Sequence, residues 1–333
     1  MTKPIMAAKT SASRISVVLC TYNGGRYLRE QLSSVAQQTR MAAELVVCDD
    51  KSTDGTVAIV REFASSAPFP VRVIVNSQRL GSTRNFDQAI GLASGECIAL
   101  CDQDDRWAPD KLERLSGILA ENLTADGVFS DAELIDENSK SIGLSLFAKH
   151  RFTARKQREF LNDPTATLLK HDVVTGSTLM FRSSVRSYSL PIPASWVHDG
   201  WLAWMIASHS RLALTTETLT AYRVHSGQQL GVGILGDSGG SELKDETRRQ
   251  HYARVARQFE DLLKKLIAEG GTGNDDLVRE IHEKIAFLNR QSTLSPSLAV
   301  RVVQMTRLLP QYVQYARGLG SFRKDLMLGG EMS

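Results

Sequence analysis

Cysteine is scarce in this sequence, and the four that occur form no metal-binding or redox motif. Cys20, Cys48, Cys97 and Cys101 each lie in or at the end of an apolar run that is typical of a strand, and no pair has the CxxC spacing. A disulfide scaffold is typical of much shorter secreted chains. We therefore expect four buried, free thiols.

Long hydrophobic segments and an excess of one charge are also missing. No apolar run reaches the roughly 20 residues of a membrane-spanning helix, since the longest candidate, Trp201 to Leu214, is interrupted by His209, Ser210 and Arg211. There are 40 basic and 37 acidic residues, so the net charge of +3 gives no reason to expect nucleic-acid binding. Residues 1–13 lack the apolar stretch of a secretory signal, and we expect a disordered tail on a cytoplasmic protein.

The glycine signatures of nucleotide binding are not where they would be needed. No GxGxxG follows the first apolar strand, where a dinucleotide fingerprint would stand, and the chain has no GxxxxGK[ST] phosphate loop. A nucleotide bound by this chain would have to be held by carboxylates, a metal ion and aromatic stacking.

The N-terminal part alternates short apolar runs with helical patterns. Four strands are expected, at 15–20, 45–48, 71–75 and 97–101, and the third of the intervening helices is expected at 82–92. Uninterrupted apolar strands separated by helices are typical of a parallel sheet covered on both faces. Ligands bind such sheets beyond the carboxyl ends of the strands, where the strand order reverses. An order of 3-2-1-4 would bring the residues after strands one, two and four into one crevice.

Three carboxylates follow the fourth expected strand at once: Asp102, Asp104 and Asp105. Like charges this close raise one another's pKa and resist joint ionisation. A divalent cation removes that cost, and closely spaced aspartate oxygens suit Mg²⁺ or Mn²⁺. The alternative is an acidic loop before the helix that begins near Pro109. This stretch alone leaves both interpretations open.

Seven motifs follow one another along the chain. They are VLCTYNG at 18–24, DDKSTDGT at 49–56, LGSTRNF at 80–86, DQDD at 102–105, SD at 130–131, HD at 198–199 and YRVH at 222–225. In this order they resemble the family 2 glycosyltransferases, near their rhamnosyltransferase-like branch. The resemblance implies the GT-A fold, an α/β nucleotide-diphospho-sugar transferase fold with a Rossmann-like, mostly parallel central sheet, here with a C-terminal helical extension.

The chain divides into three parts after its tail. We expect a GT-A glycosyltransferase domain at 14–231, a Gly-rich loop at 232–242 and a helical region at 243–333. Amphipathic helices are expected in the last part at 245–267, 275–289 and 298–319. The third carries arginines beside its valines and leucines, which leaves two interpretations: packing against the main domain, or peripheral contact with an anionic membrane.

The resemblance assigns seven residues to the donor nucleotide. Asp50 would accept a hydrogen bond from the imide N–H of uracil or thymine, because an ionised carboxylate only accepts. The alternative for Asp50 is a helix-capping turn, with Asp49 as a second candidate for that cap. The other six donor-nucleotide residues are Thr21, Tyr22, Asn23, Arg84, Asp102 and Gln103.

The resemblance also implies a divalent cation, Mg²⁺ or Mn²⁺, with Asp104 and His225 as its ligands. The metal would neutralise charge that develops on the departing nucleoside diphosphate. Whether Asp105 is a further ligand, or orients a neighbour from behind, is left open by the sequence.

Asp199 would be the catalytic general base that takes a proton from the acceptor hydroxyl. One base with a metal-assisted leaving group implies direct displacement with inversion. A helix N-cap is the alternative for Asp199. Four residues would face the donor sugar or acceptor: Asp131, Gly176, Ser177 and Trp201. Asp131 has a turn cap as its alternative.

The expected protein is an inverting, metal-dependent glycosyltransferase. It would move rhamnose or a similar sugar from a dTDP- or UDP-sugar to a hydroxyl of a lipid-linked or surface polysaccharide acceptor. We expect it in the cytoplasm or at the inner face of the membrane. The alternative is a catalytically inactive nucleotide-sugar-binding or scaffold protein, which would be expected to have lost Asp199 or the aspartate pair at 102 and 104.

Overall fold

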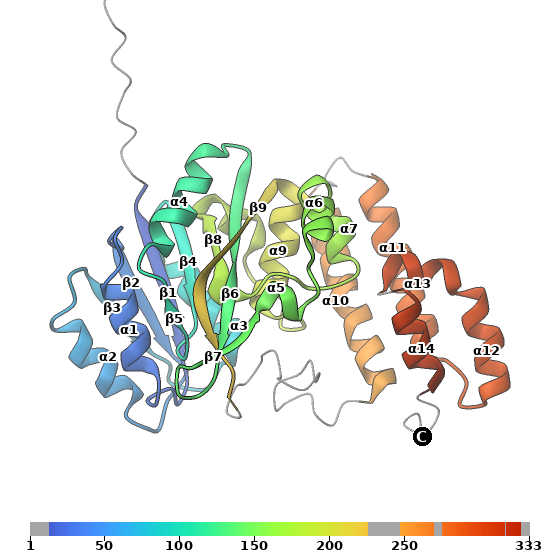
Figure 1. The fold of residues 1–333 in the computed structure, drawn as a ribbon, viewed down its shortest axis with the longest axis horizontal. Helices are drawn as coiled ribbons and strands as arrows, with labels where there is room; N and C mark the ends of the chain where they lie inside the picture. Colours follow the sequence, from blue (N-terminus) through green and yellow to red (C-terminus); the bar gives the residue numbers. More distant parts are fainter. Residues whose placement is uncertain (1–12, 226–246, 270–274, 317, 328–333) are drawn as a thin grey trace, which may run out of the picture.

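The computed structural model describes residues 13–225, 247–269, 275–316 and 318–327 (Figure 1). Its central feature is a nine-stranded sheet formed by these residues, with the strand order β3-β2-β1-β4-β8-β6-β9-β5 and with β7 paired to β6. The sheet places the carboxyl ends of its first strands at one edge, and the site is built there.

The first four strands are parallel and run in the predicted order 3-2-1-4. Their bounds are β1 Ile15–Thr21, β2 Glu44–Asp49, β3 Val71–Val75 and β4 Cys97–Cys101. Every residue of β1, β2 and β4 is buried, as expected for apolar strands covered on both faces, whereas β3 is partly exposed at the sheet edge. The cysteines Cys20, Cys48, Cys97 and Cys101 are buried free thiols, as predicted.

Helices cover both faces of this part of the sheet. Their bounds are α1 Leu28–Ala36, α2 Thr56–Ala64, α3 Ser82–Leu92 and α4 Lys111–Glu121. Alternate residues of β1 point to opposite faces: Val17 and Leu19 join the cluster that contains α1, α2 and α4, whereas Val18 joins the cluster that contains α3. The period-2 alternation of the strand therefore supplies both cores.

The remaining strands extend the sheet and make it mixed. Their bounds are β5 Arg106–Trp107, β6 Ala125–Ile135, β7 Ser141–Ser145, β8 Leu179–Arg182 and β9 Arg211–Arg223. β8 lies antiparallel between β4 and β6, and β6 pairs in parallel with β9. β5 follows the acidic cluster and pairs antiparallel with β9, so the segment after β4 is tied to the far edge of the sheet.

Short helices connect these strands. They are α5 Leu146–Lys149, α6 Ala154–Asn162, α7 Pro164–Leu168, α8 Arg186–Ser189 and α9 His198–His209, with 3₁₀ turns at Gly176–Thr178 and Ser183–Val185. α9 is apolar all round, which predicts a buried helix, and Trp201, Trp204 and Met205 on it are fully buried.

The C-terminal part is helical, as predicted, but it is divided differently. Its helices are α10 Arg248–Ala268, α11 Asp275–Ser292, α12 Leu298–Arg307, α13 Leu309–Tyr315 and α14 Leu319–Met327. The prediction of one helix over 298–319 is wrong, because the chain breaks at Leu308 and Pro310 stands in the first turn of α13. Proline lacks the N–H that a continuous helix would use at that position.

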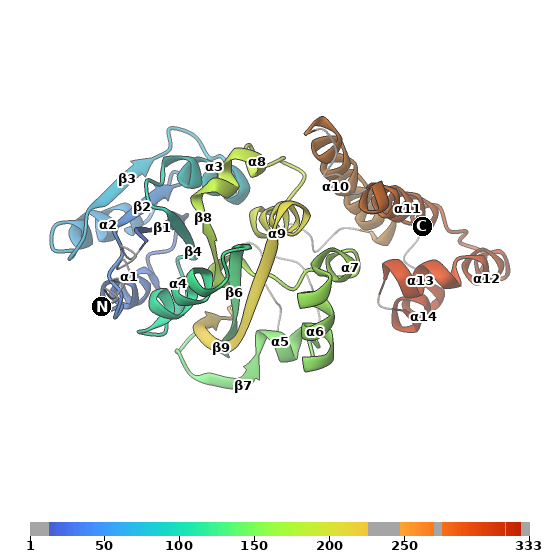
Figure 2. The ribbon, with the colours of Figure 1, turned by 90° about the horizontal axis from the view of Figure 1, so that it is seen from above.

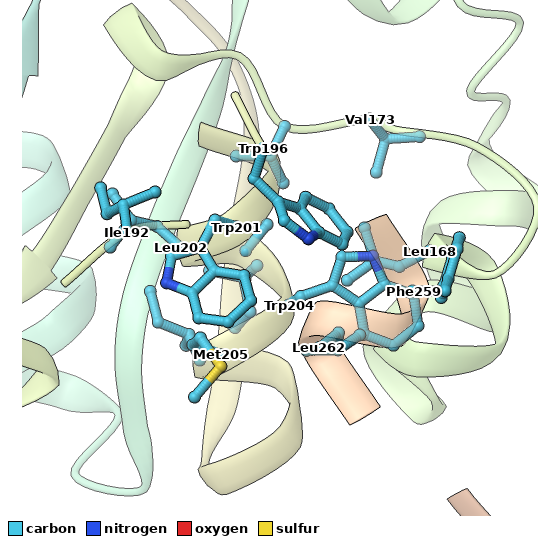
Figure 3. Close-up of a cluster of buried hydrophobic side chains, with 14 of the residues drawn as sticks. Leu168, Val173, Ile192, Trp196, Trp201, Leu202, Trp204, Met205, Phe259 and Leu262 are labelled. Atoms are coloured by element: carbon cyan, nitrogen blue, oxygen red, sulfur yellow. The ribbon is translucent and has the colours of Figure 1, made fainter. Parts of the chain in front are cut away.

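α10 packs directly on α9, and aromatic side chains form the contact (Figure 3). The ring of Phe259 lies 5.4 Å from that of Trp204 and 6.0 Å from that of Trp196, measured between centroids. Trp196 Nε1 also donates to the Gln258 carbonyl at 2.8 Å. The expected boundary between the two regions thus separates parts of one continuous hydrophobic core.

Several predicted segments fall outside the described residues. These are most of the tail at 1–13 and all of the Gly-rich loop at 232–242. A GxGxxG string does occur at 231–236, in that same stretch, far along the chain from β1 and therefore not in the position of a dinucleotide fingerprint. Among the described helices, none combines the length and the apolar character needed to cross a membrane.

Candidate active site

Gln103 ties the loop after β4 to the loop after β1. Its Oε1 accepts the Tyr22 N–H at 2.8 Å, and its Nε2 donates to the Tyr22 carbonyl at 3.1 Å. A Cβ at Gly24 would lie 2.1 Å from Gln103 Oε1, so only glycine leaves room for this contact. Gln103 and Tyr22 are both predicted nucleotide-binding residues, and these hydrogen bonds bring them together. The side-chain amide of Gln103 is occupied by the backbone of Tyr22.

Asp49 closes the turn after β2. Its Oδ2 accepts from the hydroxyls of Thr21 at 2.8 Å and Ser52 at 2.6 Å, and its Oδ1 accepts the Ser52 N–H at 2.8 Å. Of the two neighbouring aspartates, Asp49 is thus the local capping acid. Thr21, a predicted nucleotide-binding residue, is buried, with its hydroxyl donating to Asp49 and its carbonyl accepting the Asp50 N–H at 2.7 Å.

Asp50 anchors the loop that leads into α3. Its Oδ1 accepts the Leu80 N–H at 2.6 Å and Asn76 Nδ2 at 3.2 Å, and its Oδ2 accepts the Gly81 N–H at 2.9 Å. Arg79 Nε lies 3.9 Å from the same Oδ2. Since a carboxylate offers about four lone-pair sites, these three bonds leave about one, on Oδ2, for a further donor.

The aromatic ring of Tyr22 lies against the side chain of Arg79, a residue that the sequence analysis did not single out. The guanidinium of Arg79 lies 4.0 Å from the centroid of the Tyr22 ring, close enough for a cation–π contact. Beside it, Asn23 has a positive φ of 48°, and its Oδ1 accepts the Thr53 N–H at 2.8 Å. Arg84 lies exposed on α3.

The two predicted metal ligands meet. Asp104 Oδ2 lies 2.9 Å from His225 Nε2, although the two residues are 121 positions apart in the sequence. The His225 ring is tilted against the ring of Tyr27, with 5.0 Å between centroids. Both side chains of the pair retain some solvent exposure, so the pair lies at the surface of the crevice.

Asp105 points away from the crevice. Its side chain is fully buried, and its Oδ1 accepts the Arg223 N–H at 3.0 Å. The buried guanidinium of Arg223 in turn donates to the Asp104 carbonyl at 2.7 Å and to Glu30 Oε2 at 2.6 Å. Asp105 and Arg223 therefore hold the end of β9 against the acidic cluster. Arg223 stands in the YRVH motif but received no role from the sequence.

Asp199 lies in the first turn of α9, where Val197 is the N-cap residue. Its Oδ2 accepts the Gly176 N–H at 3.0 Å and its Oδ1 accepts the Gly200 N–H at 2.7 Å. A Cβ at Gly176 would lie 2.8 Å from His198 Nε2, so glycine is required there. The predicted base and the predicted small-residue loop are thus joined, and each Asp199 oxygen keeps a lone pair.

Asp102 connects the acidic cluster with the predicted base. Burial raises the pKa of Asp102 well above its ordinary value, and the negative charges of Asp105, Asp104 and Asp199 raise it further. Asp105, Asp104 and Asp199 therefore each lie within electrostatic reach of Asp102. Such a cluster favours the binding of a cation or a proton. In a metal-dependent site, the bound ion removes this repulsion between carboxylates.

Lys111 is the buried cation beneath the cluster, and the sequence analysis missed it. Its Nζ donates to Thr220 Oγ1 at 2.8 Å and to the Ser177 carbonyl, and it lies 4.0 Å from the centroid of the Trp107 ring. Burial lowers the pKa of Lys111 to about 7, against the opposing charges of Cys101, Asp105 and Asp102. The only available signal was a lysine in the helix after the acidic stretch.

Three residues predicted to face the donor sugar or acceptor are buried. Trp201 is fully buried with its Nε1 donating to the Ser189 carbonyl at 2.6 Å, so its side chain faces the core. Ser177 is likewise fully buried. Asp131 Oδ1 accepts the Phe147 N–H at 2.9 Å at the start of α5, a contact of the kind that its capping alternative implies.

The donor set fits a hard divalent cation. Asp104 and His225 supply a carboxylate and an imidazole next to each other, a combination that suits Mn²⁺ and, less strongly, Mg²⁺. Within the part of the chain that the structure describes, no three acidic, histidine or cysteine side chains are grouped closely enough to hold an ion by themselves. Further ligands would have to come from a bound diphosphate or water.

An open α/β sheet with this carboxylate crevice defines the GT-A class of nucleotide-sugar transferase folds. Two solved structures share the fold. S. aureus TarS in complex with UDP-GlcNAc superposes with a TM-score of 0.55 and 18% identity, covering 94% of this chain and 90% of that one. The mannosyltransferase PcManGT of Pyrobaculum calidifontis, in complex with GDP-Man and Mn²⁺, gives a TM-score of 0.57 and 16% identity, covering 97% and 86%.

The chain belongs to glycosyl transferase family 2, whose sequence model matches residues 16–189. An uncharacterized glycosyltransferase of Nostoc is 30% identical over 64% of this chain and 65% of the relative. The Escherichia coli protein named UDP-Glc:alpha-D-GlcNAc-diphosphoundecaprenol beta-1,3-glucosyltransferase is 34% identical over 38% of this chain and 48% of the relative. The matched part thus spans less than two thirds of the length of these curated relatives.

Proposed function

We propose that this protein is an inverting, metal-dependent glycosyltransferase that uses a dTDP- or UDP-activated sugar, with rhamnose or a similar hexose as the sugar. The observation that carries the proposal is the meeting of Asp104 with His225 at 2.9 Å, in the same carboxylate cluster as Asp199. One part of the site is suited to a cation with a diphosphate, and the other is suited to a base.

The donor nucleotide would lie over the ends of β1, β2 and β4. The remaining lone pair of Asp50 Oδ2 is available for the imide N–H of uracil or thymine. The Tyr22 ring could stack on that base through a face that the guanidinium of Arg79 does not occupy. Asn23, Arg84 and Asp102 complete the proposed donor pocket, with Gln103 fixing the position of Tyr22.

The cation would be held by Asp104 and His225. When bound, it would act as a Lewis acid toward the diphosphate leaving group. Asp105 is buried, so we do not count it among the ligands of the cation. It would act on Asp104 and His225 through Arg223, whose N–H it accepts.

Asp199 would accept the proton of the acceptor hydroxyl as that oxygen attacks C1 of the sugar. The backbone N–H groups of Gly176 and Gly200 fix the orientation of its carboxylate and leave a lone pair on each oxygen. One such base, with a lone pair left on each oxygen, supports a single displacement with inversion at C1.

The relatives support the donor and acceptor classes. The Escherichia coli relative is named for a UDP-sugar donor and a diphosphoundecaprenol-linked acceptor. TarS was solved in complex with UDP-GlcNAc. PcManGT was solved with GDP-Man and Mn²⁺. We therefore propose a lipid-linked or surface glycan as the acceptor, and a cytoplasmic enzyme with peripheral membrane contact through its C-terminal helices. An inactive scaffold is disfavoured because Asp102, Asp104 and Asp199 are all retained.

Calorimetric titration with UDP, dTDP and GDP, each with and without Mn²⁺, tests the donor and the metal together. The wild type should bind UDP or dTDP only when Mn²⁺ is present. Asp104→Asn should weaken that binding by about tenfold or more, because one charged ligand is lost. Asp276→Asn, a change of the same type on an exposed α11 side chain, is the matched control and should bind as the wild type does.

Two outcomes would contradict the proposal. Absence of nucleotide binding under all conditions would return the acidic cluster to the role of a helix-preceding loop. Preference for GDP over both pyrimidine nucleotides would refute the role of Asp50 as an imide acceptor while leaving the metal site intact.

A further inference from the structure

The outer side of α12 and α13 exposes aliphatic side chains. Val300, Val303 and Val313 are 50%, 52% and 60% exposed. The full set of large apolar residues exposed on these two helices is Leu298, Val300, Val302, Val303, Leu309 and Val313. We call this set the α12–α13 apolar surface.

α12 departs from an ordinary surface helix, which turns apolar residues inward and charged residues outward. It buries Met305, but it also buries Arg301, which is only 2% exposed and whose guanidinium donates to the carbonyls of Ser295 and Pro296 at 3.0 Å and of Leu326 at 3.3 Å. With Arg301 and Met305 on the inside, the valines are left on the outside. The helix is thus anchored in part through a charged residue and leaves Val300, Val302 and Val303 exposed.

Within residues 298–327 the exposed charges that the structure describes all have one sign, although the exposed Glu283 of α11 accepts from the Tyr315 hydroxyl at the end of α13. Between residues 298 and 327, the exposed ionisable side chains that the structure describes are Arg307, Arg323 and Lys324. The single acid of this segment, Asp325, is buried and accepts hydrogen bonds from the hydroxyls of Tyr252 at 2.7 Å and Tyr312 at 2.6 Å. The surface is therefore aliphatic and cationic, with no exposed acid among its described residues.

The position of the surface leaves it open to a large partner. α12 lies at the end of the molecule farthest from β3, and no other described element is drawn over its outer side (Figures 1 and 2). On the helix, Val300, Val303 and Arg307 follow one another at spacings of three and four, so the cation stands in the same row as the two valines.

We propose that the α12–α13 apolar surface binds the face of a bilayer that contains anionic lipids. Aliphatic side chains beside exposed cations match the acyl–headgroup boundary of such a bilayer. A second copy of this chain fits less well, since a symmetric contact would place two surfaces with cations of the same sign against each other. The inference deepens the proposed function, because a lipid-linked acceptor is presented at such a surface.

Arg301 is not part of the membrane contact, although the sequence grouped it with Arg307. Its guanidinium is buried and donates to three carbonyls inside the helical region, so Arg301→Glu would disturb folding and would not report on lipid binding. The informative changes are at exposed positions of the apolar surface.

Sedimentation with vesicles tests the proposal on the full-length protein. Vesicles of phosphatidylcholine alone would be compared with vesicles of equal parts phosphatidylcholine and phosphatidylglycerol. The wild type should bind the second and not the first. Val300→Glu with Val303→Glu should lower partitioning by about tenfold or more, and Arg307→Glu by about fivefold or more. The control pair, Met41→Glu with Leu123→Glu, changes equally exposed apolar residues elsewhere and should bind as the wild type does.

Each alternative result has a definite meaning. Equal binding by the wild type and the Val300/Val303 double variant, or no binding by the wild type, overturns the proposal. A wild-type dimer that the double variant converts to a monomer, measured by sedimentation velocity, shows that a second copy covers the surface and also overturns it. Nucleotide binding in the absence of vesicles should be the same in all variants, so a failed donor proposal is distinguished from a failed membrane proposal.

Discussion

Neighbouring aspartates in this site differ in role because different donors hold them. Asp49 closes a local turn and Asp50 anchors the loop before α3, whereas Asp104 meets the imidazole of His225. Asp199 is oriented by two backbone N–H groups with nothing else on its oxygens in the described contacts. Asp199 keeps a lone pair on each oxygen of a fixed carboxylate, whereas Asp50 keeps about one, on Oδ2, and a fixed carboxylate with free lone pairs is what proton transfer requires.

Asp199→Asn is expected to lower the rate of sugar transfer by about 10²- to 10⁴-fold, the usual contribution of a general base. The amide keeps the size of the side chain but cannot take up the proton. Affinity for the nucleotide should be nearly unchanged, since Asp199 does not contact the proposed nucleotide pocket. Transfer assays with a fixed acceptor, together with calorimetry, would check both parts. A variant that transfers sugar at the wild-type rate would refute the assignment.

The residues that could be predicted were those identified by order along the chain. The order of the first four strands could be predicted, because apolar strands that alternate with helices form a parallel sheet, and the choice of Asp104 and His225 followed from the motif resemblance. The exposure of a side chain could not be predicted in the same way. Trp201 stands two residues after Asp199 but faces the core, and Asp105 stands beside Asp104 but faces Arg223.

At the scale of elements, α9 and α10 form the contact that joins the two regions of the chain. Figure 3 shows Trp196 and Trp204 lying against Phe259 and Leu262 of α10. Ser195 also donates to Asp261 Oδ2 at 2.6 Å, a few residues before the predicted base. The segment that precedes Asp199 is therefore positioned in part by a helix that lies outside the family-matched residues.

Phe259→Ala is expected to destabilise the protein by about 3–5 kcal/mol, the usual cost of removing a buried phenylalanine. Because its ring lies between the two regions, the loss should appear in a single cooperative transition that both regions share. Urea denaturation followed by far-UV circular dichroism and by tryptophan fluorescence would measure it. Ile267→Ala, an exposed position on the same helix, should change stability by less than about 0.5 kcal/mol.

Two separate transitions, with Phe259→Ala affecting only one of them, would show instead that the regions fold independently.

The break between α12 and α13 illustrates a limit of prediction at the scale of elements. The apolar periodicity continues through Leu308, and this periodicity predicted a single helix. Pro310, in the first turn of α13, marks the break but was given less weight than the periodicity.

At the scale of the whole molecule, the helical region is needed to complete the core. The large cluster that contains α3 and α9 continues through α10, α11 and α13. Removal of residues 247–333 would expose Trp196, Trp204 and Leu168 as one apolar patch, and such patches promote aggregation. We expect a chain that ends at residue 246 to be largely insoluble.

Expression of this shortened chain beside the full-length protein, with the soluble fraction measured after centrifugation, checks the expectation. A soluble, monomeric product with cooperative unfolding would contradict it. The same product would also support independent folding in the Phe259→Ala experiment, so the two results should agree.

The distance along the chain between Asp104 and His225 has a consequence for biosynthesis. The pair joins positions 121 residues apart, and Arg223 fixes β9 against the backbone of Asp104. A ribosome-bound chain that has released β1 to β4 already displays its acids but lacks the imidazole and the buried guanidinium that organise them. Competence to bind the donor should therefore arise late in translation, once β9 has emerged and docked. Incomplete chains would then be unable to draw on the cell's activated sugars.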